Sequence, residues 1–391
     1  MMSLESPLGL RAVRMAQRLV QTPSVNPPGD VRACAHILQE AFQRSNITTE
    51  LLETEPGRVN VIARIGDAAS GPVVLLNGHL DVVPPTADWE GEAFSGRIAD
   101  GMLIGRGAVD MKSGLAAMVA VMEELRARGL PRKGQVVLAA VADEETGSRF
   151  GTRSLLERGL EASSAIVGEP TNLQIANGNR GSLLATVTFR GKAGHAARPS
   201  RGVNAISAAA VFISQLESFH PRRTDARFEV STPSLTVTMI QGGVKSNVVP
   251  DRASVTLDRR TLPGESGAMA EDELRQVLDR TTRPGIRAEL HVRTIHEPYI
   301  LPEDASPVVA MKEACRRVLQ RAPQVLAKAE ATDASYLWHL AHIPTIIFGP
   351  GDPTLAHSSG EAVPVEQIAA SAHAYLEAVR LLTEVSPYGA R

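Results

Sequence analysis

Residues 136–145 read VVLAAVADEE, an apolar run of seven residues that passes directly into three acidic ones. A continuous apolar run of this length is typical of a strand that is buried on both faces of a sheet. The acidic residues Asp143, Glu144 and Glu145 then occupy the loop at the carboxyl end of that strand. The stretch therefore predicts the centre of an α/β fold, with reactive side chains at one edge of its sheet.

Three further short apolar runs have the same organisation, at residues 73–76, 165–167 and 345–348. Residues 112–128 have the apolar spacing of a helix, which Gly129 ends. Strands that alternate with helices predict a parallel sheet with helices on both faces. Sites in such sheets form outside the carboxyl ends of the strands. The residues that we expect there are His79, Asp81, Asp110, Asp143, Glu144, Glu145, Glu169, Gly349, Gly351 and His357.

The pattern of a second domain begins near residue 182. Its expected elements follow the order strand, helix, two strands, helix and strand, which is the split order of ferredoxin-like domains. They fall at residues 183–189, 204–219, 234–240, 253–257, 271–281 and 288–293. We therefore predict an α/β protein with a mixed, largely parallel sheet flanked by helices. This catalytic domain comprises residues 1–181 and 295–391, and a ferredoxin-like α+β domain at residues 182–294 is inserted into it.

The composition excludes several classes of function. The 391 residues carry 41 Lys and Arg against 43 Asp and Glu, and only 4% are aromatic, which does not favour nucleic-acid binding. Cys34 and Cys315 are too few for a disulfide framework or a thiolate zinc site, and they fit buried thiols in a reducing compartment. We find no 18-residue apolar stretch, and residues 1–21 do not have the pattern expected of a signal peptide. We expect a cytoplasmic protein without a nucleic-acid or membrane partner.

The donor atoms at the sheet edge favour a metal site. Two imidazoles with several carboxylates and no thiolate suit a pair of divalent cations, and such a set accepts zinc, cobalt and manganese. Adjacent Glu144 and Glu145 point in different directions on an extended segment, so one can bind a cation while the other acts as a base. Taken singly, each residue also has a structural explanation, such as a helix N-cap for Asp110.

Six segments of the sequence carry a family resemblance: NGHLDVVP (77–84), GRGAVDMKSG (105–114), DEETGS (143–148), VGEPT (167–171), GKAGHAARP (191–199), and FGPG with AHSSGE (348–351 and 356–361). Together they resemble the dizinc hydrolases that include acetylornithine deacetylase, succinyl-diaminopimelate desuccinylase, aminoacylase and glutamate carboxypeptidase. They span most of the chain in the order of that family, and the inserted domain stands where the family has its lid and dimerisation domain.

The resemblance implies two divalent metal ions, with Zn²⁺ expected and Co²⁺ or Mn²⁺ as alternatives. One ion would be held by His79, Asp110 and Glu169. The other would be held by Asp110, Glu145 and His357, so that Asp110 bridges the two.

The resemblance also implies the catalytic and substrate-binding residues. Glu144 would be the general base and would pass its proton to the leaving amine. The carboxylate of Asp81 would orient His79 by a hydrogen bond to its imidazole ring. His195 would reach the site of the partner subunit in a homodimer and stabilise the tetrahedral oxyanion. Substrate contacts would come from Arg260, as a carboxylate clamp, and from Asn247, Gly349 and Gly351.

The substrate class follows from one segment. VGEPT (167–171) resembles the deacetylase and desuccinylase branch, which implies hydrolysis of the amide bond in an N-acyl amino acid. The alternatives are a dipeptidase or glutamate-type carboxypeptidase that takes short peptides, and a metal-binding relative without turnover. One departure leaves the acyl group and the amino acid open: residues 330–333 read EATD where the family has a Gly-Gly-(Ser/Thr)-Asp segment in its substrate pocket.

Overall fold

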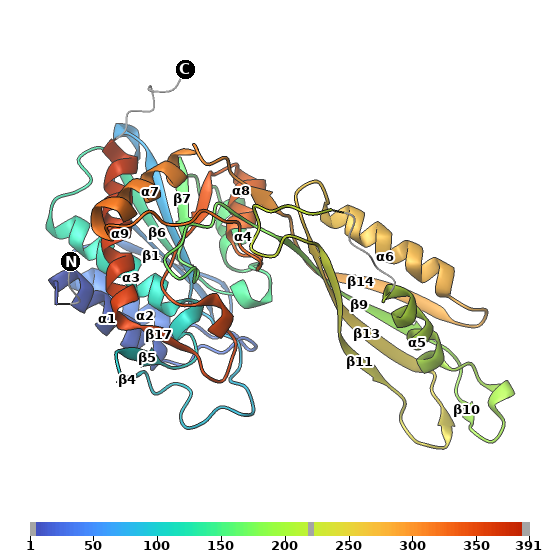
Figure 1. Ribbon diagram of the computed structural model, residues 1–391. Helices are drawn as coiled ribbons and strands as arrows, with labels where there is room; N and C mark the ends of the chain where they lie inside the picture. The colour runs from blue at the N-terminus through green and yellow to red at the C-terminus, as the bar shows by residue number, and fades with distance from the viewer. Residues whose placement is uncertain (1–4, 218–222, 385–391) are drawn as a thin grey trace. The chain divides into compact units, whose positions relative to one another are not determined.

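The computed structural model describes residues 5–217 and 223–384. These residues divide into two compact units. Unit 1 comprises residues 1–178, 300–328 and 332–391, and unit 2 comprises residues 179–299 and 329–331, in each case as far as they are described. Figure 1 labels the helices and strands of both units.

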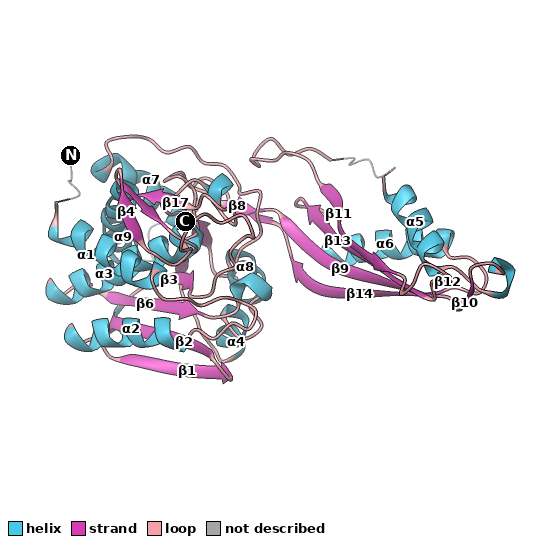
Figure 2. Ribbon diagram, turned by 90° about the horizontal axis from the view of Figure 1, so that it is seen from below, coloured by secondary structure: helices cyan, strands magenta, loops and turns pink. Residues whose placement is uncertain are grey.

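Unit 1 is built on a six-stranded sheet in the order β1-β2-β6-β3-β7-β16. β6, β3, β7 and β16 run parallel, whereas β2 pairs antiparallel with both β1 and β6 (Figure 2). The prediction of a mixed, largely parallel sheet flanked by helices is therefore confirmed. The strand bounds are β1 (Thr49–Glu55), β2 (Arg58–Asp67), β3 (Val73–His79), β6 (Gly134–Val141), β7 (Ser164–Val167) and β16 (Thr345–Ile347).

Helices cover both faces of this sheet. One layer holds α2, α3, α7 and α9, with α1 packed on α3 and α9, while α4 and α8 lie on the other face (Figure 1). Because helices lie over both faces, the side chains of residues 136–142 are buried whichever way they point, which explains the apolar run. The helix bounds are α1 (Pro7–Val20), α2 (Arg32–Arg44), α3 (Ser113–Ala127), α4 (Thr152–Glu157), α7 (Ser306–Val318), α8 (Ala334–Ala341) and α9 (Val365–Glu384).

Shorter elements connect the strands to the helices of unit 1. Three short strands form a second, antiparallel sheet in the order β17-β5-β4, which is separate from the six-stranded sheet. Short helical turns at Ala108–Lys112 and Glu144–Thr146 carry expected site residues. None of the described helices has the length and apolar content needed to cross a lipid bilayer. The strand bounds are β4 (Arg97–Ala99), β5 (Met102–Ile104), β8 (Gly178–Asn179), β15 (Tyr299–Ile300) and β17 (Ala362–Pro364).

Unit 2 contains a four-stranded antiparallel sheet in the order β11-β13-β9-β14, with α5 and α6 packed on it. The chain order is strand, helix, two strands, helix and strand, which is the ferredoxin-like order expected from the sequence. Phe189 and Phe212 meet in its core, with ring centroids 5.6 Å apart. The bounds are β9 (Gly181–Arg190), α5 (Ala205–Leu216), β11 (Ser234–Gly242), β13 (Arg252–Thr261), α6 (Gly267–Thr281) and β14 (Arg287–His296).

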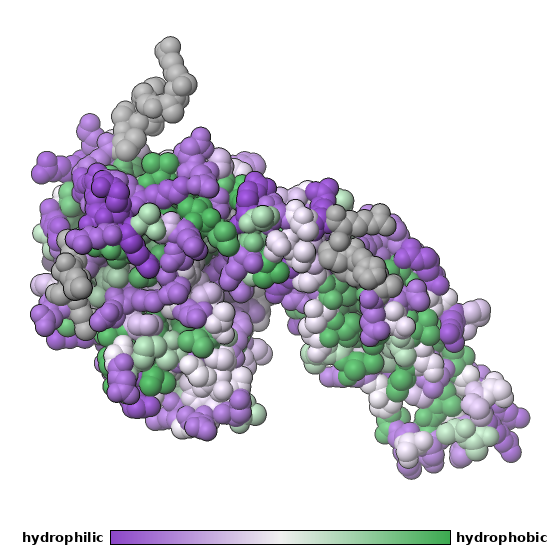
Figure 3. Space-filling view, in the orientation of Figure 1, coloured by the Kyte–Doolittle hydropathy of each residue, from purple (hydrophilic) through white to green (hydrophobic). Residues whose placement is uncertain are grey.

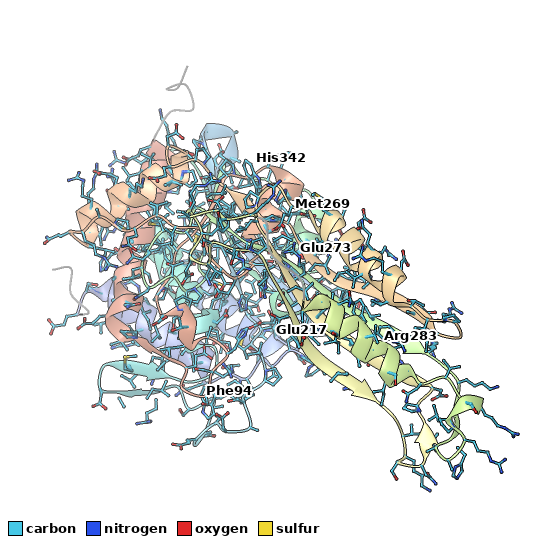
Figure 4. The ribbon with its side chains drawn as sticks, turned by 45° about the vertical axis from the view of Figure 1, so that its right-hand side comes forward. Phe94, Glu217, Met269, Glu273, Arg283 and His342 are labelled. Atoms are coloured by element: carbon cyan, nitrogen blue, oxygen red, sulfur yellow. The ribbon has the colours of Figure 1, made fainter. Side chains whose placement is uncertain are left out.

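Three further details complete the description of unit 2. A short pair formed by β10 (Gly194–His195) and β12 (Val248–Val249) lies outside the four-stranded sheet. Arg259 on β13 is nearly buried and forms ion pairs with Glu265 and with Glu273 of α6. Glu273 is labelled in Figure 4. The expected helix at 204–219 ends at Leu216, and the last two of its expected residues lie outside the described part of the chain.

Candidate metal centre

Histidine and carboxylate side chains meet at the carboxyl ends of the strands of unit 1. His79 is the last residue of β3, Glu144 and Glu145 follow β6, and Glu169 follows β7. Asp110 lies in the turn before α3, with non-helical backbone angles (φ −118°, ψ 101°) that interrupt the turn. The parallel order of β6, β3 and β7 brings these loops to one edge, as expected for an α/β sheet.

Asp110 lies between the two histidines. Its Oδ1 is 3.0 Å from Nε2 of His79, and its Oδ2 is 3.3 Å from Nε2 of His357. Nε2 of His79 is also 3.4 Å from Oε1 of Glu169, and Nε2 of His357 is 3.4 Å from Oε2 of Glu145. The five residues thus form two donor groups that share one carboxylate.

This donor set fits divalent cations. Donor atoms of His79, Glu144 and Glu169 lie within 4.8 Å of one another, as do those of His79, Asp110 and Glu145. Among the described residues, Oε1 of Glu145 is buried without a hydrogen-bond partner. An ionised carboxylate left in this state is costly, and a cation removes the cost. Glu144 belongs to the same cluster, so its carboxylate lies close to the other groups that could hold cations.

The pKa values of the cluster show the same need for positive charge. Burial opposes protonation of His79, but its hydrogen bonds to Asp110 and Glu169 outweigh burial and raise its pKa well above the usual 6.5. Hydrogen bonds to Asp110 and Glu145 raise the pKa of His357 to about 11. Burial raises the pKa of Glu145 to about 7. Protons on the imidazoles and carboxylates thus balance the negative charge that cations would otherwise balance.

Glu144 has the environment of a base with a raised pKa. Burial raises the pKa of its carboxyl group well above 4.5, and the charge of Glu169 acts in the same direction. A carboxylate with a pKa closer to the working pH transfers protons more efficiently than an ordinary surface one. A bound cation nearby would act in the opposite direction and favour the ionised form.

Asp81 is placed differently from the expectation. Nδ1 of His79 lies 2.8 Å from the backbone carbonyl oxygen of Asp81, whereas its distance to the Asp81 carboxylate is 3.7 Å. The carboxylate instead accepts hydrogen bonds from the backbone amides of Glu144 (3.2 Å) and Glu145 (3.3 Å). The expected hydrogen bond between the Asp81 carboxylate and the imidazole is therefore wrong. The backbone amides of Glu144 and Glu145 begin a helical turn and have no helical partner, so they donate to the Asp81 carboxylate. Nδ1 of His79 already lies within hydrogen-bond distance of the backbone carbonyl of Asp81 and does not need the carboxylate.

Asp333 holds the loop that follows Glu145. Its carboxylate is 2% exposed and accepts hydrogen bonds from the hydroxyl groups of Ser148 and of Thr152, the latter at 2.6 Å. Burial raises the pKa of Asp333 to about 6. In the EATD segment, Asp333 thus binds neighbouring elements of unit 1, and Glu330 belongs to unit 2.

The glycines after β16 have contacts within unit 1. The amide of Gly349 donates to the hydroxyl of Thr171 at 3.1 Å, and the amide of Gly351 donates to Oε1 of Gln367 at 2.8 Å. A Cβ atom at Gly349 would stand 2.4 Å from the carbonyl oxygen of Gly168. Gly349 therefore lets the last strand's loop approach the backbone that carries Glu169, and its amide is already used inside the protein.

Unit 2 brings together His195, an expected catalytic residue, and Asn247, an expected substrate contact, and separates both from Arg260. His195 pairs with Val248, and the amide of Ala196 donates to the carbonyl oxygen of Asn247 at 3.0 Å. Arg260 lies opposite Ser182, near the start of β9, while His195 follows the end of that strand. His195 and Asn247 are thus exposed neighbours at one end of unit 2, and Arg260 lies at the other.

A second arginine, which the sequence analysis missed, lies beside Arg260. Arg180 is 4% exposed, and its Nη2 donates to the hydroxyl of Ser234 at 2.9 Å. In the described part of the chain, its Nε is buried without a hydrogen-bond partner. Burial lowers the pKa of Arg180, and the charge of Arg260 lowers it further. The charges of Asp258 and Glu330 act in the opposite direction, so carboxylates of the chain partly balance the two guanidinium groups. The only sequence signal is an arginine just before a predicted strand.

The sequence is similar to a family of peptidases and to curated proteins. The sequence model of peptidase family M20/M25/M40 matches residues 75–381. The succinyl-diaminopimelate desuccinylase of Methylobacterium radiotolerans is 32% identical over 372 residues, covering 91% of this chain and 93% of that protein. The enzyme of the same name from Cereibacter sphaeroides is 34% identical over 378 residues, covering 92% of this chain and 95% of that protein.

Solved structures share the fold. An M20 family metallo-carboxypeptidase from Sulfolobus solfataricus has a TM-score of 0.82 at 20% identity, with coverage of 96% of this chain and 99% of that one. Human carnosine dipeptidase 1 has a TM-score of 0.74 at 17% identity, covering 96% of this chain and 97% of that one. A dinuclear metal-binding M20 peptidase of Bacillus subtilis has a TM-score of 0.68 at 19% identity, covering 96% of this chain and 99% of that one.

Proposed function

The chain belongs to peptidase family M20/M25/M40, and from that premise we propose that it removes the acyl group of an N-acyl amino acid by hydrolysing a linear amide bond. It is a metallohydrolase that acts on amide bonds. The observation that carries the proposal is the Asp110 carboxylate, which faces His79 with one oxygen and His357 with the other. In addition, the two relatives that are about one-third identical to this chain are named succinyl-diaminopimelate desuccinylases.

We assign the two cation sites as follows. His79, Asp110 and Glu169 would hold one ion, and Asp110, Glu145 and His357 would hold the other, with Zn²⁺ as the expected metal and Co²⁺ or Mn²⁺ as alternatives. Bound there, such ions would lower the pKa of a water molecule and would polarise the carbonyl group of the substrate.

Glu144 takes the proton of the attacking water and passes it to the leaving amine nitrogen. The Asp81 carboxylate positions Glu144, because it accepts a hydrogen bond from its backbone amide at 3.2 Å. The carbonyl of Asp81 positions His79 in turn, by accepting a hydrogen bond from its Nδ1. Asp81 thus acts through two other residues, and Glu144 is the group that touches the reacting atoms.

We propose that the working form is a homodimer with shared sites. Arg260 lies opposite Ser182, and β9 then runs to Arg190 before the chain reaches His195. The strand from Ser182 to Arg190 spans roughly 26 Å at about 3.3 Å per residue, which is longer than an N-acyl amino acid. His195 and Arg260 of one chain are therefore too far apart to hold the same substrate. If both bind it, they come from different copies, and His195 stabilises the oxyanion in the partner's site.

The surface of unit 2 supports this dimer. β11 is an edge strand, so one side of its backbone has no partner strand among the described residues of unit 2. Apolar side chains stand exposed on β11 and on the loop after it: Met239 is 53% exposed, Ile240 54% and Val244 84%. Figure 3 shows apolar side chains gathered along the part of unit 2 that carries β11 and α5. Pairing of two such edges about a two-fold axis would cover both the backbone and these side chains.

We propose that the amino acid part of the substrate carries a carboxylate bound by unit 2. Arg260 holds Asp258 at 2.8 Å through two nitrogens and remains 29% exposed, and the buried Arg180 stands beside it. Asn247, which adjoins His195, and the turn with Gly349 and Gly351 are the further candidates for substrate contact. The amides of Gly349 and Gly351 are already used, so a contact there would be made by carbonyl groups.

A dipeptidase or carboxypeptidase is the second candidate function. It is favoured by the names of the structurally similar carboxypeptidase and carnosine dipeptidase. A relative without turnover is disfavoured, because every expected ligand and the expected base are present in unit 1. We also place the enzyme in the cytoplasm, since Cys34 and Cys315 are free and buried, as suits a reducing compartment.

The deciding experiment is amine release from a substrate panel. Purified protein with added Zn²⁺ is given N-acetyl, N-succinyl and N-formyl amino acids beside simple dipeptides, with a chelated sample as control. We expect chelator-sensitive release from the N-acyl amino acids, and the fastest substrate names the acyl group. Release from dipeptides alone would assign the protein to the peptidase branch. Silence across the panel, with metal bound, would overturn the proposed activity.

A further inference from the structure

A buried ion pair lies behind the metal centre of unit 1. Nη1 of Arg106 is 2.5 Å from Oε2 of Glu361, and the two side chains are 1% and 0% exposed. They stand 255 positions apart in the sequence. Arg106 lies in the segment before Asp110, and Glu361 lies in the segment that begins near His357. The pair therefore ties together two loops that each carry an expected ligand.

Glu361 fixes the backbone from which the shared ligand projects. Its Oε1 accepts hydrogen bonds from the backbone amides of Val109, at 2.8 Å, and Asp110, at 3.1 Å. One carboxylate oxygen thus binds the amides of the turn, while the other binds Arg106. A hydrogen bond to an ionised acceptor is stronger than one between neutral groups, so this carboxylate limits the movement of Asp110.

Arg106 fixes the other ligand. Its Nη2 donates to the backbone carbonyl oxygen of His357 at 3.3 Å. Its guanidinium group also lies 5.0 Å from the ring centroid of Trp89. Trp89 belongs to the loop between β3 and β4, which also carries Phe94, labelled in Figure 4. His357 itself is only half-buried, so its own packing constrains it less than the other ligands are constrained.

We propose that Arg106 and Glu361 are positioning residues that set the separation of Asp110 from His357 and thereby the affinity for the second cation, the one that Asp110, Glu145 and His357 would hold. The inference rests on the ligand assignments of the proposed function. His79 and Glu169, by contrast, stand near the ends of β3 and β7, and in the described part of the chain the hydrogen bonds of the pair reach neither of them. Asp110 belongs to both sites, but His357, which Arg106 holds, belongs to the second site alone, so loss of the pair affects the second site more than the first.

A purely structural ion pair would behave differently. Removal of one member of a buried pair leaves an uncompensated charge and destabilises the whole domain. In that case, both cation sites would weaken together with the free energy of unfolding. Groups that orient metal ligands instead change metal affinity about 10- to 100-fold when they are replaced. The two cation affinities, measured separately, distinguish these roles.

The experiment measures stepwise Zn²⁺ binding by calorimetry, with metal content after dialysis as a second readout. Wild-type protein is compared with Glu361→Gln, which keeps an oxygen acceptor and loses the charge. The double variant Arg106→Gln/Glu361→Gln removes both charges and so leaves neither one uncompensated. We expect each variant to bind the first Zn²⁺ within about threefold of wild type and the second about 10- to 100-fold more weakly.

Two control variants show what the loss of one cation site and the loss of an unrelated ion pair look like in these measurements. His357→Ala, which removes a ligand, defines the signature of losing the second site alone. Arg259→Gln breaks another nearly buried ion pair, in unit 2, and should leave both Zn²⁺ affinities unchanged. Circular dichroism and thermal unfolding are recorded for every variant.

The outcomes separate the inference from the proposed function. If wild-type protein binds two Zn²⁺ ions and Glu361→Gln and the double variant bind both with unchanged affinity, the positioning role is overturned and the metal centre stands. Equal weakening of both sites, in step with lost thermal stability, would also overturn it in favour of a structural pair. If wild-type protein does not bind two Zn²⁺ ions, the ligand assignments fail, and the inference fails with them.

Discussion

Nε2 of His357 lies 3.3 Å from Oδ2 of Asp110, while the other oxygen of the same carboxylate faces His79. One carboxylate therefore joins two donor groups whose remaining members come from different loops. This relationship explains why both imidazoles hold protons so strongly in the metal-free protein, because each stands between carboxylates.

Zinc binding should release protons. At pH 7 His357, with a pKa of about 11, is protonated, His79 has a pKa well above 6.5, and Glu145, with a pKa of about 7, is partly protonated. A metal needs all of them deprotonated, so binding releases more than one proton and the Zn²⁺ affinity rises with pH. Calorimetry in two buffers of different ionisation enthalpy measures the number. His357→Ala should release fewer protons, and a binding heat that is independent of the buffer would contradict the assignment.

Glu144→Gln should abolish turnover and leave the metal bound. The substitution removes the group that accepts the proton of the water but keeps the size and shape of the side chain. We expect kcat to fall by about 10²- to 10⁴-fold. Metal content after dialysis should remain that of wild type. A variant that retains more than about one-tenth of the wild-type kcat, with its metal content verified, would show that another group is the base.

Mixing two inactive variants should restore activity if the sites are shared. In a heterodimer of Glu144→Gln and His195→Ala chains, one site has both defects and the other has neither. At random exchange of equal amounts, about a quarter of all sites are intact, so about a quarter of wild-type activity should return. The dimer is checked by light scattering. A mixture that stays inactive after demonstrated subunit exchange would place His195 in its own chain's site.

The two arginines of unit 2 should act on substrate binding. Arg260→Ala removes a charge-assisted contact to the substrate carboxylate, which predicts a loss of about 10- to 100-fold in kcat/KM, mainly through KM. Arg180→Lys keeps the charge but not the geometry, so we expect a smaller loss. The matched control is Arg287→Ala, an exposed arginine on β14 that pairs with Glu289. A substrate whose carboxylate is replaced by an amide should be insensitive to Arg260→Ala, and equal losses on both substrates would argue against a clamp.

Asp333 should make the metal-free protein less stable as the pH rises. Its folded-state pKa of about 6 exceeds its unfolded value of 3.8, so the native state binds the extra proton. Its contribution to stability is complete below about pH 4 and is lost as the pH rises through about 6, with a size of about 3 kcal/mol. Asp333→Asn removes this contribution, so the difference between the variants should shrink or reverse from pH 4 to pH 6. Urea unfolding of chelated protein measures it, and a difference that is constant across this range would rule out the raised pKa.

Local sequence determined the frame of the protein. The run at residues 136–142 is apolar at every position, and only a strand covered on both faces makes that pattern favourable, so the parallel sheet was predictable. Because the strands of a parallel sheet end at the same edge, the polar residues that directly follow them were also expected to lie close together there. β1 and β2 received no element in the sequence analysis. β1 reads TELLETE, in which glutamate and leucine favour helix as much as strand, and only its pairing with β2 decides the structure.

Tertiary structure alone decided how the site residues use their atoms. Whether Asp81 presents its carboxylate or its carbonyl to His79 depends on which amides lie nearby, and those belong to Glu144 and Glu145, more than 60 positions along the chain. The contact of Arg106 with Glu361 likewise joins loops that only the completed sheet brings together. Residue types and strand order follow from local physical chemistry, because burial and periodicity act on neighbours in sequence. The pairing of individual hydrogen-bond donors and acceptors depends on ångström-scale distances between distant segments, which no local pattern encodes.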